Sequence, residues 1–223
     1  MRMPAQSFAV GLLLVRSVFL LSRLNSNAKA RALIAGFQPL HDALEAANDA
    51  KRKADNAELF ARGPVVEIDQ LVAVFLTIFQ LDVLKVVAKN YDDPLYVAIF
   101  PKGLKELRKL HGQALLDELM RIALRLKELG TAHPLAAHLP ALAAFAKDYA
   151  APLKTLKAAA DAQDAADVAL SHAKKVWRAA YDGIAGSLRA LFAGRKTYQE
   201  SFFYPEPTSH AVKPAAQATP KTE

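Results

Sequence analysis

The stretch LEAANDAKRKADNA at Leu44–Ala57 is matched 112 residues later by LKAAADAQDAADVA at Leu156–Ala169. A leucine, two aspartates and five alanines are identical in the two stretches. Two weaker matches flank them in the same order, at offsets of 105 and 104 residues: Val15–Ser26 with Met120–Thr131, and Ile99–Pro101 with Phe203–Pro205. Similarity at a nearly constant spacing predicts a duplicated helical unit of roughly 100 residues.

The composition of the chain favours helices. Hydrophobic residues make up 52% of the 223 residues but aromatic residues only 8%, and alanine accounts for about one residue in five. Alanine is the best helix former, and only 9 glycines are present to interrupt helices. The sequence therefore predicts an all-α helical bundle built from two tandem, weakly similar three-helix units. The alanine and arginine usage is also typical of a bacterial source.

We expect the first helical unit at 1–103 and the second at 104–207, packed together as one bundle. In the first unit, a polar cluster and a glycine–proline pair are typical of helix ends. These signals separate three expected helices, at about 6–24, 28–60 and 67–90, with the ends at Asn25-Ser26-Asn27 and Arg62-Gly63-Pro64.

In the second unit, a helix at 104–129 should end at Gly130, which is followed by Pro134. For 140–194 the sequence leaves two alternatives open, one long helix or two helices with a turn near Ser171. The remaining tail at 208–223 is rich in proline, alanine and threonine and has no apolar periodicity, so we expect it to be disordered.

Each expected unit closes with an aromatic cluster followed by a proline, at Phe100-Pro101 and Tyr204-Pro205. Proline cannot continue a helix, and large apolar side chains seek burial. We therefore expect these clusters to fold back over the end of the bundle. The alternative is that they form a docking site for a partner.

Two apolar segments bear on where the chain resides. Phe8–Leu24 is interrupted by Arg16 and Arg23, whereas a secretion signal normally keeps its apolar region free of charge. Leu71–Phe79 is the most apolar run, but it is shorter than the ~20 residues that cross a bilayer. We expect both to be core helices and the chain to be cytoplasmic, with membrane attachment through the N-terminal helix as the alternative.

Sequence motifs for catalysis or cofactor binding are not visible. The chain has no cysteine, no phosphate-binding glycine loop and no nucleophile elbow. Its six histidines lack the Glu-x-x-His spacing of metal-binding bundles, and Asp161, Asp164 and Asp167 are expected to form a solvated helix face. We therefore expect no metal, no cofactor and no enzyme activity.

One constellation points to a binding surface. On a helix covering about 171–196, five residues project within one arc and an apolar set falls on another arc. The net charge of +7 weakly favours anionic partners, and basic side chains at successive turns can contact phosphates. The residues of this expected basic stripe are Lys174, Arg178, Tyr181, Arg189 and Lys196.

These observations favour a non-catalytic structural or protein–protein interaction protein that binds a protein partner or itself. The alternative is a binder of an anionic surface, nucleic acid or acidic membrane, through the basic stripe. A third alternative is a bundle that buries an apolar ligand between Leu12–Leu24 and Leu71–Leu84, the two most apolar helices.

Overall fold

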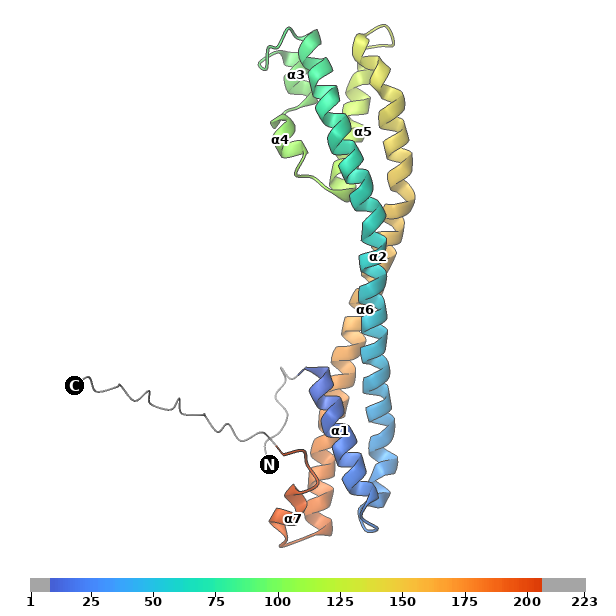
Figure 1. The fold of residues 1–223 in the computed structure, drawn as a ribbon, viewed down its shortest axis with the longest axis vertical. Helices are drawn as coiled ribbons and strands as arrows, with labels where there is room; N and C mark the ends of the chain where they lie inside the picture. The colour runs from blue at the N-terminus through green and yellow to red at the C-terminus, as the bar shows by residue number, and fades with distance from the viewer. Residues whose placement is uncertain (1–8, 206–223) are drawn as a thin grey trace, which may run out of the picture. The chain divides into compact units, whose positions relative to one another are not determined.

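The computed structural model describes residues 9–205, and the regular elements in this range are helical (Figure 1). This confirms the all-α prediction; the predicted disordered tail at 208–223 lies outside the described residues. The helices are α1 (Val10–Asn25), α2 (Ile34–Val86), α3 (Pro94–Ile99), α4 (Gly103–Leu107), α5 (Gly112–Glu128), α6 (Leu139–Leu191) and α7 (Lys196–Glu200), with 3₁₀ turns at Arg31–Leu33 and Pro134–His138.

The two halves of the chain share one order of elements, as expected for a tandem repeat. A helix of 16 or 17 residues, a 3₁₀ turn, a helix of 53 residues and short helices follow one another in each half. The long helices α2 and α6 begin 105 residues apart. The sequence match of Leu44–Ala57 at an offset of 112 is therefore displaced by seven residues, one heptad. Alanine recurs often enough on these helices for a shift of two turns to keep the apparent similarity.

The predicted helix end at Arg62-Gly63-Pro64 is wrong, because α2 runs through it without a break. A proline inside a helix removes one backbone hydrogen bond and leaves the carbonyl of the residue four positions earlier unpaired. Phe60, Gly63 and Pro64 are all exposed, so water can solvate that carbonyl. In the second half, 139–191 forms one helix, which settles the alternative that the sequence left open.

The chain packs as two compact units, and neither is a contiguous half of the sequence. Unit 1 contains 9–45 and 173–205 of the described residues, and unit 2 contains 46–172. Each unit therefore combines a short helix and the start of the following long helix with the end of the long helix from the other half. The division at 103/104 describes sequence repeats and stays a prediction about the chain's organisation.

The core of unit 1 forms where α1 packs against the end of α6. Trp177 is fully buried and donates a 2.6 Å hydrogen bond from Nε1 to Oγ of Ser17. Its ring stacks on Tyr181 at a centroid distance of 4.8 Å, and Tyr181 in turn contacts Phe203. Since Leu13, Leu20 and Leu24 of α1 are also fully buried, the prediction of a core helix in this segment is confirmed.

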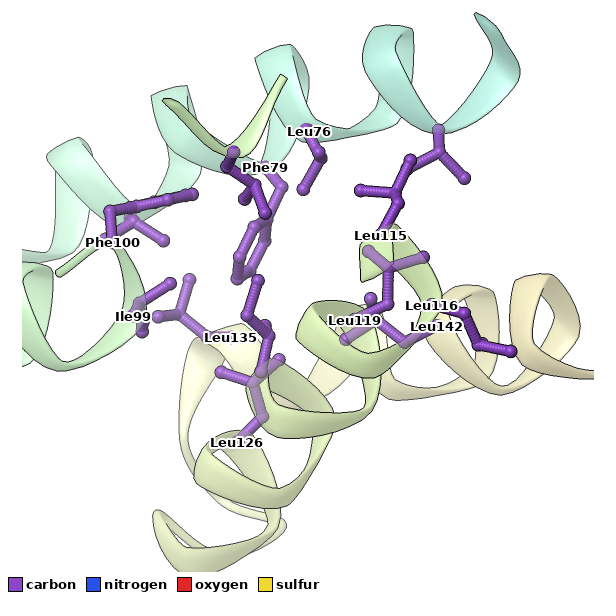
Figure 2. Close-up of a cluster of buried hydrophobic side chains, with 14 of the residues drawn as sticks. Leu76, Phe79, Ile99, Phe100, Leu115, Leu116, Leu119, Leu126, Leu135 and Leu142 are labelled. Carbon is purple, nitrogen blue, oxygen red and sulfur yellow. The ribbon is translucent and has the colours of Figure 1, made fainter. Parts of the chain in front are cut away.

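The core of unit 2 is formed by α2, α5, the start of α6 and the segment around α3. Figure 2 shows Leu76 and Phe79 of α2 and Leu135 pointing toward one another, with Ile99 and Phe100 beside them. Phe100 is 3% exposed and Phe203 8%. The aromatic residues at the end of each repeat therefore fold back over their bundles, as predicted.

Both long helices end in the same kind of turn. The third residue after α2 is Lys89, with φ of 63°, and the third residue after α6 is Gly194, with φ of 76°. Positive φ is strained for a residue with a β-carbon but not for glycine. The first half of the chain therefore carries strain at a place where the second half does not.

We predict that Lys89→Gly stabilises the protein by about 1 kcal/mol and that Gly194→Ala destabilises it by a similar amount. Urea unfolding followed by circular dichroism at 222 nm measures both changes. Lys85→Gly, within α2, is the matched control and should destabilise, because glycine in a helix interior costs about 1 kcal/mol. A destabilising Lys89→Gly would contradict the prediction.

Candidate interaction surfaces

The second half of α2 has two apolar faces on opposite sides of the helix. One face is buried in the core of unit 2 by five residues: Val65, Val72, Leu76, Phe79 and Val83. The opposite face exposes four large apolar side chains: Leu71 (56%), Val74 (62%), Ile78 (55%) and Leu81 (55%). We call these four residues the α2 seam. The predicted core helix is therefore buried on one face only.

The seam residues follow one another at intervals of three, four and three residues. This is the spacing that places side chains in one narrow stripe and is used by helices that pack against another helix. Glu67 and Lys85 continue the stripe at its two ends and are both exposed. Contiguous exposed apolar surface with a polar border is typical of an interaction site.

A buried carboxylate joins three helices of unit 2. Oδ1 of Asp69 accepts a 2.6 Å hydrogen bond from the hydroxyl of Tyr149 and a 3.1 Å hydrogen bond from the backbone N–H of Gly112. Nδ1 of His111 lies 3.2 Å from Oδ2. Because Gly112 is the first residue of α5, Asp69 caps that helix from α2, and a carboxylate is favoured at a helix N-terminus.

Burial raises the pKa of Tyr149 well above its usual range, and the hydrogen bond to Asp69 adds to this effect. The phenol therefore remains a donor to Asp69 at neutral pH. A cavity of about 620 Å³ adjoins the Asp69 cluster; its polar lining residues are Arg62, Asp69, Gln70, Arg108 and His111. Arg62 is paired with Glu58 at 2.6 Å. The contacts of Asp69 thus support a capping role.

Two polar pairs set the register of α2 against α6 in unit 2. Lys51 Nζ lies 3.3 Å from a carboxylate oxygen of Asp167, and Nε2 of Gln163 donates a 2.8 Å hydrogen bond to Asp55. Asp55 also pairs with Lys51 along α2. The hydrogen bond from Lys51, and then that from Gln163, lowers the pKa of Asp55.

The Asp69–Tyr149 contact follows the same antiparallel register, because it lies 18 residues farther along α2 from Lys51 and 18 residues back along α6 from Asp167. Of the three aspartates expected to form a solvated face, Asp167 contacts Lys51 of α2, whereas Asp161 pairs locally with Lys157 at 3.2 Å.

The structure does not keep the basic stripe together. Tyr181, expected on the outer face, is 2% exposed and lies in the core of unit 1. Lys174 and Arg178 are half-buried, and Arg189 is exposed on α6. Lys196 belongs to α7 rather than to the same helix.

Two members of the stripe nevertheless meet. Arg189 and Lys196 line a cavity of about 110 Å³, with Gln199 and Glu200 of α7 also in its wall. The basic surface that the structure assembles is therefore smaller than the predicted stripe and contains no exposed aromatic ring from it.

Other expectations concern ligands and membranes. Among residues 9–205, groups of three or more His, Asp or Glu side chains arranged to hold a metal ion are not found. The helical stretch Arg31–Val86 is long and apolar enough to cross a membrane by length and composition alone, a test that core helices also pass. The two segments expected to enclose an apolar ligand lie in different units, α1 in unit 1 and Leu71–Leu84 in unit 2.

No protein family, curated protein or solved structure was found to match this chain. The interpretation of its surfaces therefore rests on their geometry and chemistry.

Sequence reasoning missed both the α2 seam and the Asp69 cluster. The heptad spacing of Leu71, Val74, Ile78 and Leu81 is visible in the sequence, but every side of this helix segment is apolar, so the spacing alone does not show which face is buried. Asp69 and Tyr149 are 80 residues apart, and no local pattern connects them.

We predict that Tyr149→Phe destabilises unit 2 by about 1–3 kcal/mol, since it removes a donor from a buried carboxylate. Chemical unfolding followed by circular dichroism at 222 nm measures the loss. Tyr91→Phe, at a 58% exposed tyrosine of the same unit, is the control and should change stability by less than about 0.5 kcal/mol.

The raised pKa of Tyr149 adds a pH dependence to this prediction. Above pH ~10 the unfolded chain loses the phenol proton while the folded chain retains it, so the stabilising contribution is present below this pH and lost as pH rises. The stability difference between the wild type and Tyr149→Phe should therefore shrink between pH 9 and 11. A constant difference across this range would contradict the assigned environment.

Proposed function

We propose that this chain is a non-catalytic interaction protein whose working surface is the α2 seam. The observation that carries the proposal is the exposure of four large apolar side chains at heptad spacing on the face of α2 opposite the core. Burying such side chains against a second helix contributes about 25 cal/mol per Å² of apolar surface removed from water. The expected partner is therefore a protein that offers a matching helical face.

Three features of the fold support this proposal. The seam lies on a helix whose other face is fixed in the core by Val72, Leu76 and Phe79, so the surface is rigid before binding. The adjoining Asp69 cluster ties α2 to α5 and α6. The burial of α1 in unit 1 supports a cytoplasmic protein over one that is attached to a membrane through this helix.

Photo-crosslinking in cells of the source organism tests the proposal. A photoreactive amino acid is placed at Val74, in the seam, or at Val168, an equally β-branched and 71% exposed position on α6. We expect Val74 to give a discrete protein adduct, either a second copy or another protein, and Val168 to give little. Equal labelling at the two positions would show that the seam is not an interface.

A second candidate function, contact with an anionic surface, keeps one supporting observation. Arg189 and Lys196 are both exposed and line one small cavity in unit 1, a suitable size for a single phosphate group. Because Tyr181 is buried, stacking on nucleic-acid bases is not available from this residue. Such a surface would bind through phosphate contacts alone.

For this candidate we predict that Arg189→Gln/Lys196→Gln weakens binding to a duplex oligonucleotide and lowers the slope of log K against log salt by about 2. Fluorescence anisotropy between 50 and 300 mM salt measures the slope. Lys154→Gln/Lys157→Gln, two exposed lysines of unit 2, is the charge-matched control. An unchanged slope in the Arg189/Lys196 variant would exclude this surface.

A further inference from the structure

The α2 seam reads the same from both ends. Leucine occupies both outer positions, at Leu71 and Leu81, and β-branched residues occupy both inner positions, at Val74 and Ile78. These pairs are nested around Leu76, which lies on the buried face. A two-fold symmetric contact between identical chains requires a surface that is complementary to itself in this way.

The charged residues that border the seam follow the same nesting. Glu67 lies four residues before Leu71 and Lys85 lies four residues after Leu81, and both are exposed. When two seams align antiparallel about Leu76, Glu67 of each copy faces Lys85 of the other. A parallel alignment places Glu67 against Glu67 and Lys85 against Lys85, which is repulsive at both ends.

From this complementarity, and resting on the proposed function of the seam, we propose that the α2 seam binds the seam of a second copy of this chain in an antiparallel helix pair. Leu71 packs against Leu81 of the other copy and Val74 against Ile78, twice each. Two Glu67–Lys85 ion pairs close the ends of the contact.

The neighbouring residues in unit 2 are compatible with these ion pairs. Lys85 already contacts Asp82 at 2.7 Å, but its ammonium group has three donors and can retain Asp82 while it binds Glu67 of the partner. Asp82 is further contacted by Nε2 of His138 at 3.3 Å. The hydrogen bond from Lys85 is the largest cause that lowers the pKa of Asp82, so this carboxylate is charged at neutral pH.

The extent of the seam sets the expected affinity. From Glu67 to Lys85 the helix rises by about 27 Å, and one helix face of this length gives an interface at the lower end of the range for specific complexes. Exposed ion pairs contribute ~0–1 kcal/mol each, so the charges select the antiparallel orientation more than they add affinity. The contact is a reversible dimer whose population depends on protein concentration.

Sedimentation equilibrium of the full chain over a hundredfold concentration range tests the association. We expect a monomer–dimer equilibrium that Val74→Asn/Ile78→Asn weakens at least tenfold and that the control Val168→Asn leaves unchanged. Circular dichroism confirms that each variant is folded. A chain that is monomeric throughout, or a dimer indifferent to the seam variant, would overturn the inference.

Charge exchange tests the orientation. Glu67→Lys alone and Lys85→Glu alone each create two like-charge contacts, and each should weaken the dimer by about fivefold to tenfold. The double variant E67K/K85E restores opposite charges and should recover most of the affinity. Failure of the double variant to recover association would rule out the antiparallel contact.

Because the chain has no cysteine, disulfide trapping gives an independent measurement of register. Leu71→Cys and Leu81→Cys proteins of different tag lengths are mixed and oxidised. We expect the 71–81 disulfide to exceed the 71–71 and 81–81 disulfides. An excess of the like pairs would show a parallel contact and overturn the inference.

The outcomes separate this inference from the proposed function. A monomeric chain that still gives a discrete adduct with another protein from Val74 would retain the proposed function and exclude the second copy. Binding of the monomer to phosphatidylcholine vesicles, lost in Val74→Asn/Ile78→Asn, would identify a lipid surface as the occupant and exclude both.

Discussion

One antiparallel register between α2 and α6 holds unit 2 together. Apolar helix faces rich in alanine slide past one another at little cost, because neighbouring turns offer similar surfaces. The polar contacts remove this freedom: Lys51 with Asp167, Asp55 with Gln163, and Asp69 with Tyr149 all obey a single alignment. The first two pairs are half-exposed and contribute little energy, whereas Asp69 is buried and needs its donors.

The exchange of helices between the two repeats follows from the length of α2 and α6. A helix of 53 residues needs apolar cover along its whole length, and a short helix such as α1 or α5 covers only about a third of it. In each unit the short helix and the start of its own long helix are completed by the end of the other long helix. The duplication therefore makes two similar cores, and neither repeat completes one alone.

Helix class and the repeated order of elements could be predicted from the sequence, because alanine content and glycine stops act locally. Gly130 ended α5 as expected. Pro64 misled because proline breaks a helix only where the lost hydrogen bond cannot be replaced, and here that side of α2 faces solvent. Tyr181 misled because a tyrosine on a basic arc can still turn its ring into the core, where Trp177 and Phe203 surround it.

A chain made of two alike repeats has to choose which helix end each hairpin pairs with during folding. At an offset of 105 residues, the positions equivalent to Asp69 and Tyr149 are Lys174 and Leu44, so the polar pair exists in unit 2 alone. If the α1 hairpin took the place of the α5 hairpin, Leu44 would lie beside Asp69 and the carboxylate would lose its hydroxyl donor. Such a lone buried charge is costly. Asp69 therefore acts as an address that rejects the wrong hairpin, which protects the duplicated chain from misassembly.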